Sequence, residues 1–309
     1  MATTAQSQTI TVDGRDVVIT HPFKVLYPET GTTKADVVGY LTRIAPILLP
    51  HLHDRAVTRK RWIDGTGTAE NPRESFFQRN LDDTTPEWIV RRTVQHKERT
   101  VDYAIANDAS TLLWFAQTAS LELHVPQWRF GPRGAHRSPD RLVIDLDPGP
   151  GTDLPECVEV ALLVRDLLLE RDLEALPVTS GGKGVHLYAP LNGSLGSDQA
   201  TEIASDVADQ LVSSRPALAV ANMRKVNRDG KVLVDWSQNR AAKTTVSPYS
   251  LRGRTRPTVA APRTWAELEA PGLGQMEFPE VLARVERSGD LLKPLLSQPI
   301  PSSKADAPQ

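Results

Sequence analysis

The sequence has 309 residues, of which 39% are hydrophobic and 24% are charged, and its formal net charge is −2. This composition predicts a soluble globular protein of one large or two modest domains, and it excludes nucleic-acid binding through a high overall positive charge. The single cysteine, Cys157, excludes an internal disulfide, and no segment has the roughly 20 apolar residues of a membrane helix or the features of a signal peptide. We therefore expect a cytoplasmic protein that does not associate with membranes.

The N-terminal half mixes strand and helix patterns. Residues 9–20 alternate around an Asp-Gly pair, which predicts a β-hairpin. Helical spacing predicts a helix over residues 34–52, which Pro46 should kink or end. A further helix is predicted over residues 108–123, starting from an Asp or Ser cap, and residues 121–128 then become extended. Strands are predicted at residues 56–62, 87–94 and 100–106, with the last two paired.

The second half repeats this mixture, so the predicted fold class is α+β. Residues 142–147 form an apolar, β-branched run typical of a buried strand, and residues 153–173 form the strongest amphipathic helix pattern in the chain. Another capped helix is predicted over residues 197–216. From about residue 288 the chain becomes rich in Pro and Ser, which predicts a flexible tail over 288–309. Further strands are predicted at residues 176–180, 185–191 and 231–236.

Two acidic residues, Asp145 and Asp147, end the strand at 142–147. Side chains alternate across a strand, so these carboxylates share one face and would repel each other unless a cation lay between them. Mg²⁺ and Mn²⁺ prefer such oxygen ligands. The alternative is a pair of strand-end acids that cap the next helix. Asp235 ends the apolar strand 231–236 in the same way, and if the two strands are neighbours, three carboxylates converge as in two-metal phosphoryl-transfer sites.

A glycine-rich turn, "TSGGKGVHLY" (179–188), separates two predicted strands. Its glycines allow close backbone approach and positive φ, and its backbone N–H groups could cradle a phosphate. It is not a P-loop, because a strand follows it rather than a helix. A plain glycine hairpin is the alternative, and the three nearby acids favour phosphate binding. The donors and glycines of this turn are Ser180, Gly181, Gly182, Lys183, Gly184 and His186.

Local basic and aromatic clusters occur within the slightly acidic chain, as selective binding to a phosphate backbone requires. Adjacent Phe76 and Phe77 should face opposite sides of a strand, so that one lies in the core and the other can stack on a base. Solvated surfaces are the alternative for each basic cluster. His124 lies at a strand end, and the alternative to a functional role is that it is a hydrogen-bonded structural residue. His51 and His53 fit a helix end better than a metal site. The basic clusters are Arg59, Lys60 and Arg61, and Arg252, Arg254 and Arg256.

These motifs together resemble the polymerase domain of bacterial ligase D, in the archaeo-eukaryotic primase (Prim-Pol) superfamily. The resemblance covers roughly residues 21–287 and rests on eight motifs in order. They are "KVLYPETGTTKAD", "TRKRW", "LELHVPQWRF", "RLVIDLDPG", "VTSGGKGVHLY", "KVLVDWSQN", "KTTVSPYSLRGR" and "PTVAAPRTWAEL".

The resemblance implies a single Prim-Pol catalytic domain over residues 1–287. An RRM-like antiparallel-sheet module, about 116–287, would pack with an N-terminal α/β module, about 1–115. It also implies template-directed addition of nucleotides, preferably ribonucleotides, to a 3′-OH at gaps or broken ends. The implied cofactors are two Mn²⁺ or Mg²⁺ ions. The implied partners are DNA with gapped, 5′-phosphorylated or broken ends, NTPs and dNTPs, with Ku and an ATP-dependent ligase as further candidates. We expect a monomer.

The resemblance implies a role for each residue of this sequence that occupies a functional position of the family's motifs. Asp145, Asp147 and Asp235 match the metal-binding and catalytic acids. The nucleotide-binding positions are matched by His124, Ser180, Lys183, Gly184, His186, Arg228, Gln238, Lys243 and Arg252. The pocket for the downstream 5′-phosphate is matched by His21, Lys24 and Lys34, although His21 replaces an asparagine of the family. Further DNA-binding positions are Arg59, Lys60, Arg61, Phe76, Phe77 and Arg254.

The sequence leaves other interpretations open. Residues 93–103 and 225–232 fill loops that vary in the family and can set DNA-end bridging or primer position. No ligase or nuclease module is present in the 309 residues, and we expect a free-standing relative rather than an excised domain. A module that binds 5′-phosphorylated ends and recruits Ku or a ligase is the main alternative function. A metal-dependent nuclease built on the same acids is another.

Overall fold

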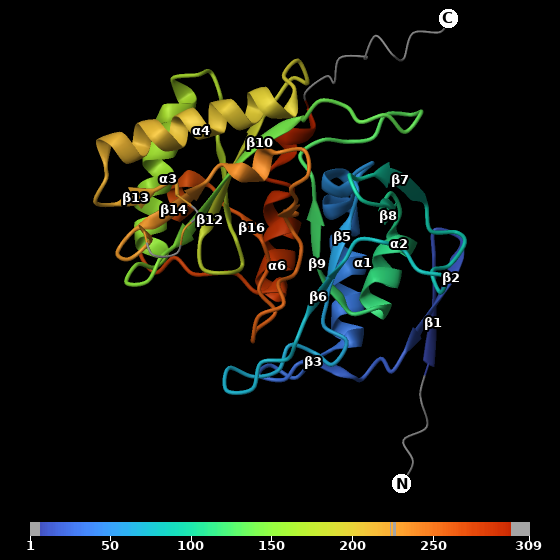
Figure 1. Ribbon diagram of the computed structural model, residues 1–309. Helices are drawn as coiled ribbons and strands as arrows, with labels where there is room; N and C mark the ends of the chain where they lie inside the picture. The colour runs from blue at the N-terminus through green and yellow to red at the C-terminus, as the bar shows by residue number, and fades with distance from the viewer. Residues whose placement is uncertain (1–6, 223, 225–226, 298–309) are drawn as a thin grey trace, which may run out of the picture. The chain divides into compact units, whose positions relative to one another are not determined.

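A computed structural model describes residues 7–222, 224 and 227–297 of the chain (Figure 1). The chain divides into two compact units, which are described separately. Unit 1 comprises Met1–Val125, Val246–Val259 and Glu277–Gly289. Unit 2 comprises Pro126–Thr245, Ala260–Met276 and Asp290–Gln309. Over the described ranges, no helix is both long and apolar enough to cross a membrane.

Unit 2 is built on a β-α-β-β-α-β succession, the order of ferredoxin-like and RRM-like folds. Its six-stranded sheet has the order β13-β14-β10-β12-β11-β16, and β10 pairs antiparallel with both β12 and β14. The succession consists of β10 (Arg141–Pro148), α3 (Leu154–Leu169), β11 (Leu176–Thr179), β12 (Val185–Pro190), α4 (Ser197–Ser214) and β14 (Val232–Asp235). The edge strands are β13 (Ala219–Val220) and β16 (Ala261–Pro262).

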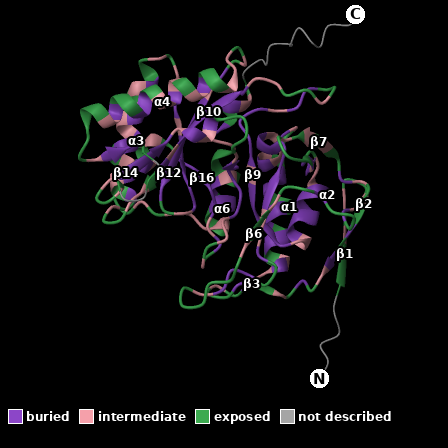
Figure 2. Cartoon of the chain, viewed as in Figure 1, coloured by how far each residue is buried: buried purple, intermediate pink, exposed green. Residues whose placement is uncertain are grey.

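Strand alternation decides which face of this sheet is covered. Leu142, Ile144 and Leu146 of β10 belong to one apolar core with residues of α3 and α4. Figure 2 shows buried residues in the sheet and exposed residues on the outer surfaces of both helices. Because neighbouring side chains point to opposite faces, Asp145 and Asp147 lie on the face that α3 and α4 do not cover. The buried half of the strand therefore fixes where its two acids point.

Unit 1 packs helices against smaller sheets. Its predicted hairpin is confirmed as β1 (Ser7–Val12) and β2 (Arg15–Thr20), with positive φ at Asp13 and Gly14. One sheet has the order β15-β9-β5-β6, and β7 and β8 form the pair expected from the sequence. The other elements are β3 (Val25–Tyr27), β4 (Thr32–Thr33), α1 (Lys34–Leu52), β5 (Thr58–Arg61), β6 (Phe76–Gln78), β7 (Arg91–Gln95), β8 (Thr100–Ala104), α2 (Ala109–Gln117), β9 (Ser120–Val125) and α6 (Phe278–Ser288). Strand β15 (Thr245–Val246) spans a boundary between the units.

The helix predicted over 34–52 is confirmed as α1, and of the two effects expected of Pro46, ending the helix is excluded because both Pro46 and Pro50 lie inside it. One helix prediction in unit 1 is corrected. The helix predicted over 108–123 stops at Gln117, and its last residues form β9 instead. Ala119 has a left-handed backbone (φ 54), which breaks the helix, and the alternating pattern of "SLELHV" then continues as a strand.

Other predicted segments have mixed outcomes. Residues 93–103 lie in the β7–β8 hairpin rather than in an irregular loop, and residues 225–226 of the other variable loop lie outside the described residues.

At the C-terminal end, Leu292 and Leu295 are buried around the 3₁₀ helix η3 (Lys293–Leu296), and residues 298–309 lie outside the described residues. The remaining short elements are η2 (Ser237–Asn239) and α5 (Trp265–Leu268).

Gly184 is required by the contact between the glycine turn and β10. A Cβ atom at this position would overlap the carbonyl oxygen of Leu146. We expect Gly184→Ala to lower the free energy of unfolding by more than about 2 kcal/mol, measured by chemical denaturation. Gly39 of α1 is the control, because a Cβ there meets no atom within 4 Å. Gly39→Ala should stabilise the protein by about 0.5–1 kcal/mol, and equal effects of the two variants would contradict the steric explanation.

Candidate active site and nucleic-acid-binding residues

Three carboxylates converge on the uncovered face of the unit 2 sheet. Asp145 of β10 pairs directly with Asp235 of β14, and Asp147 lies two residues farther along β10. Cross-strand partners in an antiparallel pair project to the same face, with Cβ atoms roughly 4.5–5.5 Å apart. The strand adjacency that the sequence left open is therefore confirmed.

The three negative charges shift one another's ionisation. The pKa of Asp147 is raised to about 6, chiefly by the Asp145 carboxylate, with desolvation and Asp235 acting in the same direction. His186 and Arg228 oppose this shift. Because Asp147 is exposed, we attribute its raised pKa to the neighbouring carboxylates rather than to burial. The site concentrates negative charge where solvent can reach it.

Asp235 is held in place by the residues that follow it. Its Oδ1 accepts hydrogen bonds from the backbone N–H and the hydroxyl of Ser237, and its Oδ2 accepts one from the side-chain amide of Gln238. Gln238, expected to contact the nucleotide, thus orients an acid. Ser237 was missed by the sequence analysis, although the "DWSQ" sequence places hydroxyl and amide donors directly after Asp235.

The donor set fits a hard divalent cation. All three acids offer oxygen atoms, and the raised pKa of Asp147 reflects a repulsion that a bound cation would relieve. Within the described residues, no three His, Cys, Asp or Glu side chains already form a closed metal-binding group. Catalytic magnesium sites commonly use one or two protein carboxylates together with substrate phosphates, so an open arrangement agrees with such a site.

The glycine turn before β12 is held by Ser180, which the sequence placed in the turn, and by Gln275, which the sequence did not. The Ser180 hydroxyl accepts from the N–H groups of Gly182 and Gly184, and Gln275 accepts from the N–H of Gly181. These three N–H groups are therefore already occupied, contrary to a cradle in which they all bind phosphate. The exposed Lys183 side chain is the charged group that this turn presents to solvent.

His186 connects the turn to the acids. It lies opposite Asp145 in the β10–β12 register, with its Nε2 3.3 Å from Oδ1 of Asp145. The ring is buried, and its Nδ1 has no hydrogen-bond partner among the described residues. Lys243 and Arg228, the other predicted nucleotide contacts of unit 2, lie on loops; Lys243 is exposed and Arg228 is close enough to lower the pKa of Asp147.

Unit 1 gathers a second group of predicted residues around an acid that the sequence analysis missed. Glu122 of β9 is 2% exposed, and its carboxylate lies 2.8 Å from His124 Nε2 and 3.2 Å from Arg252 Nε. Lys60 of β5 lies opposite Glu122, and Phe77 of β6 lies opposite Lys60. Glu122 and His124 are two positions apart in an apolar strand, the same spacing as Asp145 and Asp147, and that spacing was the signal available in the sequence.

Both adjacent phenylalanines are exposed, contrary to the expectation that one enters the core. Phe76 is 44% and Phe77 is 56% exposed, in keeping with the position of β6 as a three-residue strand at the edge of its sheet. Phe77 contacts the edge of the His124 ring at 5.2 Å, and Arg61 lies over Phe76. Two aromatic surfaces are therefore available to solvent on unit 1.

Arg59 is not available for a DNA contact in this structure. It is 1% exposed, and its guanidinium lies 4.6 Å from the centre of the Trp114 ring. Burial, with a smaller contribution from Arg61, lowers the pKa of Arg59 to about 10. Arg61 itself donates to the carbonyl of Thr118 and to Gln78. Alternation along β5 turns these two arginines toward α2, and Lys60 points to the other face.

The predicted 5′-phosphate residues lie together at the start of unit 1. The backbone N–H of Lys34 donates to the carbonyl of Lys24, and that of Lys24 donates to the carbonyl of His21. Lys34 is buried, its ammonium donates to the carbonyl of Thr20, and burial followed by Lys24 lowers its pKa. Lys24 is half-buried and His21 is exposed, and Arg254 is exposed on a separate loop.

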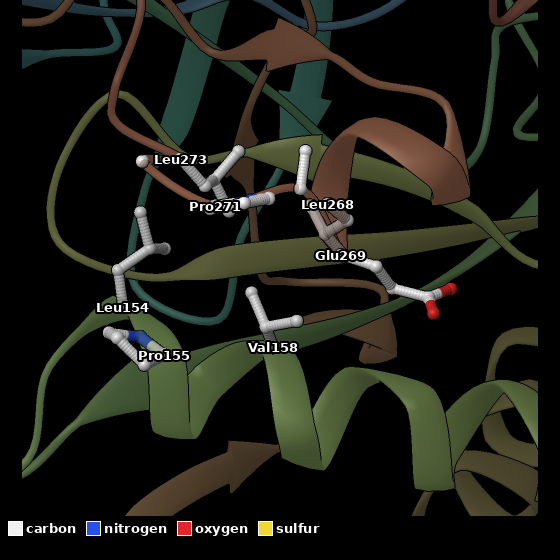
Figure 3. Close-up of a pocket in the computed structure, with 9 residues that line it drawn as sticks. Leu154, Pro155, Val158, Leu268, Glu269, Pro271 and Leu273 are labelled. Carbon is white, nitrogen blue, oxygen red and sulfur yellow. The ribbon is translucent and has the colours of Figure 1, made fainter.

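A separate apolar groove of about 390 Å³ lies on unit 2 (Figure 3). Leu154, Pro155 and Val158 at the start of α3 line one side, and the segment 268–273 lines the other. The Glu269 carboxylate points away from these apolar side chains (Figure 3). None of the predicted site residues lines this groove.

Three carboxylates that converge on the open face of an antiparallel sheet are typical of enzymes that use two metal ions for phosphoryl transfer. The model of the family described as "LigD, primase-polymerase domain" matches residues 33–292. The chain belongs to this family, and it is a nucleotidyltransferase.

Individual relatives agree with this assignment. The chain is 50% identical over 279 residues to the "Multifunctional non-homologous end joining protein LigD" of Mycolicibacterium smegmatis, covering 90% of this chain and 36% of the relative. It is 31% identical to the "Bifunctional non-homologous end joining protein LigD" of Bacillus subtilis, covering 86% of this chain and 42% of the relative. The chain thus spans well under half the length of these curated relatives.

A solved structure matches almost completely. It is the "Polymerase Domain from Mycobacterium tuberculosis Ligase D in complex with DNA", with a TM-score of 0.86 and 49% sequence identity. The match covers 94% of this chain and 99% of that structure. The α+β fold expected from the sequence is therefore confirmed.

Replacing Asp147 by Asn removes one of the repelling charges. Because the pKa of Asp147 is raised in the folded protein, its ionised form opposes folding, so the penalty is absent below its ordinary pKa and complete above about pH 6. Without divalent cations, Asp147→Asn should raise the free energy of unfolding at pH 8 and change it less at pH 4, measured by urea denaturation. The exposed Asp209 of α4 is the control. Asp209→Asn should show no such gain, and equal gains for both variants would refute the assignment.

Proposed function

We propose that the protein is a template-directed polymerase that adds nucleotides, preferably ribonucleotides, to a 3′-OH at gaps or broken DNA ends. The observation that carries this proposal is the register of β10 and β14, in which Asp145 opposes Asp235 and Asp147 extends the same face. A strand-end helix cap would need one acid, and it would not need a third on a neighbouring strand.

Asp145 and Asp147 would hold two divalent ions, Mn²⁺ or Mg²⁺, with Asp235 on one of them. Such ions, when bound, lower the pKa of an attacking hydroxyl and neutralise the charge of a triphosphate. The protein's own contribution is positioning: Ser237 and Gln238 fix the rotamer of Asp235, and the paired strands fix the spacing of all three acids. No covalent intermediate with the protein is required.

Arg228, which acts on the pKa of Asp147, and the exposed Lys183 and Lys243 support the proposal that unit 2 binds a nucleotide. In unit 2 we propose Lys183, Arg228 and Lys243 as partners of the triphosphate or the base, with Ser180 and Gly184 shaping the turn and His186 lying between the turn and Asp145. Gln238 would act through Asp235. In unit 1 we propose His124 and Arg252 as triphosphate contacts, in keeping with the motifs that carry them.

DNA contacts are proposed on unit 1. Phe76 and Phe77 would stack on bases, because every base offers a ring face and both side chains are exposed. Lys60, Arg61 and Arg254 would contact phosphates, whereas Arg59 would have a packing role because of its burial. His21, Lys24 and Lys34 would bind the 5′-phosphate of the downstream strand.

The cellular process is proposed from the relatives. Two LigD proteins that match this chain are named for non-homologous end joining. We propose that this protein fills gaps or extends ends during DNA repair in the bacterial cytoplasm, with Ku and an ATP-dependent ligase as candidate partners. Its matching region is the polymerase part of those longer proteins.

Removing an acid tests the catalytic assignment. Asp145→Ala and Asp147→Ala should each lower nucleotide incorporation by at least about 10³-fold, because charge stabilisation at the reacting phosphate is lost. DNA affinity should persist. The measurement is primer extension with Mn²⁺ or Mg²⁺ on gapped, overhanging and unprimed DNA, comparing NTPs with dNTPs. Asp209→Asn is the control for surface charge. Full activity in the Asp145→Ala/Asp147→Ala double variant would refute the assignment.

The 5′-phosphate proposal is tested separately. Lys24→Ala combined with Lys34→Gln should remove any preference for a phosphorylated downstream end, measured as the ratio of affinities for phosphate and hydroxyl ends. Glutamine retains a donor for the Thr20 carbonyl, which limits the effect on folding. Lys293→Ala, an exposed lysine of η3, is the matched control. An unchanged ratio in the double variant would contradict the proposal.

The alternative function has a distinct result in the same assays. A module that only binds DNA ends and recruits Ku or a ligase would discriminate 5′-phosphorylated ends without incorporating any nucleotide. A nuclease would shorten labelled DNA instead of extending it. Extension by the unaltered protein, abolished by loss of Asp145 or Asp147, would exclude both.

A further inference from the structure

Glu122 is a buried carboxylate whose two oxygens are both occupied. Oε2 lies 2.8 Å from Nε2 of His124, and Oε1 lies 3.2 Å from Nε of Arg252. The backbone N–H of Gly253 also donates to Oε1, at 3.1 Å. A buried charge is costly unless it is paired, and here it is paired on both sides. The arrangement joins two residues that are 128 positions apart in the sequence.

The surroundings fix the ionisation of Glu122. Burial opposes its ionised form, but Arg252 and then His124 outweigh burial and hold the pKa of the carboxyl well below its usual range. An ionised carboxylate can only accept hydrogen bonds, so Nε2 of His124 carries a proton in both charge states of the ring. The Nδ1 atom is consequently the one whose protonation changes.

The backbone beside Arg252 is fixed as firmly as the side chains. A Cβ atom at Gly253 would overlap the Trp62 ring, so only glycine brings this N–H to Glu122 without displacing that ring. The Tyr27 hydroxyl donates to the carbonyl of Arg252 at 3.0 Å. The position of the guanidinium therefore depends on Glu122, Tyr27 and Trp62 together.

We propose that Glu122 is a positioning residue that holds His124 and Arg252 for binding the triphosphate of the incoming nucleotide. This inference rests on the proposed function, because it takes His124 and Arg252 as triphosphate contacts. Glu122 itself does not touch the substrate. It sets the tautomer of His124, so that Nδ1 faces the ligand, and it sets the orientation of the Arg252 fork.

Proton uptake follows from this arrangement. Burial lowers the pKa of His124, Glu122 raises it, and the nearby Arg252 and Lys60 lower it further. The neutral ring cannot donate from Nδ1, so an arriving phosphate is bound best when His124 takes up a proton there. Nucleotide affinity should therefore fall as pH rises, and Glu122 should extend tight binding toward higher pH.

The charged and titratable groups that face the His124 ring come from three segments. Glu122 belongs to its own strand, Lys60 lies on β5, and Arg252 follows β15. Phe77 of β6 contributes an uncharged aromatic ring in a T-shaped contact. Of these groups, only Glu122 favours the protonated ring, so removing its charge should lower the pKa of His124.

The experiment compares Glu122→Gln with the unaltered protein in primer extension and in equilibrium nucleotide binding across pH 5.5–8.5. We expect the KM for NTP to rise about tenfold or more, with a smaller change in kcat, because the affected residues bind the triphosphate. The pH at which affinity declines should move downward. Asp108→Asn is the matched control, since Asp108 also pairs with an arginine, Arg15, in unit 1, and asparagine retains its helix cap.

A double-mutant comparison separates positioning from general destabilisation. In a His124→Ala background, Glu122→Gln should raise the KM for NTP much less than it does alone, because one of the two residues that Glu122 positions is already absent. Fully additive effects, or an unchanged KM and pH profile in Glu122→Gln, would overturn the inference.

A measurement on the unaltered protein remains decisive if Glu122→Gln fails to fold. Long-range ¹H–¹⁵N correlation spectra should show neutral His124 as the tautomer with its proton on Nε2. The opposite tautomer would overturn the inference. If the unaltered protein incorporates no nucleotide in any assay, the proposed function fails, whereas the spectra still decide whether Glu122 sets the His124 tautomer.

Discussion

The pairing of β10 with β14 is the constraint on which the catalytic proposal depends. A shift of one residue in this register would move Asp145 and Asp147 from the open face into the core against α3 and α4. Leu142, Ile144 and Leu146, which alternate with the acids along β10, oppose that shift because they fill the core. Gly184 adds a second restraint, since its backbone contacts β10 where a larger residue could not. Packing on one face thus sets the chemistry of the other.

The two units handle buried and half-buried charge differently. In unit 2 the acids repel one another, and part of that repulsion is retained in the raised pKa of Asp147. A site of this kind sacrifices some stability for the ability to bind cations. In unit 1 the buried acid Glu122 pairs with Arg252 and His124, which hold the pKa of its carboxyl well below its usual range. We propose that the acids of unit 2 bind cations, whereas His124 and Arg252 of unit 1 bind the negatively charged triphosphate.

Edge strands explain why unit 1 exposes aromatic rings. Within the described residues, strand β6 has three residues and pairs with β5 alone, and both Phe76 and Phe77 are exposed. Natural proteins usually protect such an edge with charge, and here Lys60 and Arg61 lie over the two rings. An exposed ring beside a cation is also a suitable surface for a nucleic-acid base.

Local signals in the sequence predicted most elements, because they depend on near neighbours. The Asp-Gly hairpin, the helices at 34–52 and 197–216, and the acid-ended strands all follow from periodicity, caps and turns. The failures lie where distant contacts decide the outcome. Arg59 is buried because it packs on Trp114 of α2. Neither Phe76 nor Phe77 enters the core, because β6 lies at the edge of its sheet.

The sequence by itself determined that Asp145 and Asp147 share a face, because strand alternation is a local property. It also placed Asp235 at the end of a similar strand. Only the tertiary structure decided that Asp235 stands opposite Asp145, since register between distant strands depends on core packing. In the same way, the spacing of Glu122 and His124 was present in the sequence. Their junction with Arg252 arises only when the chain folds back to bring "SLRG" beside β9, because a buried carboxylate needs partners that its own strand does not supply.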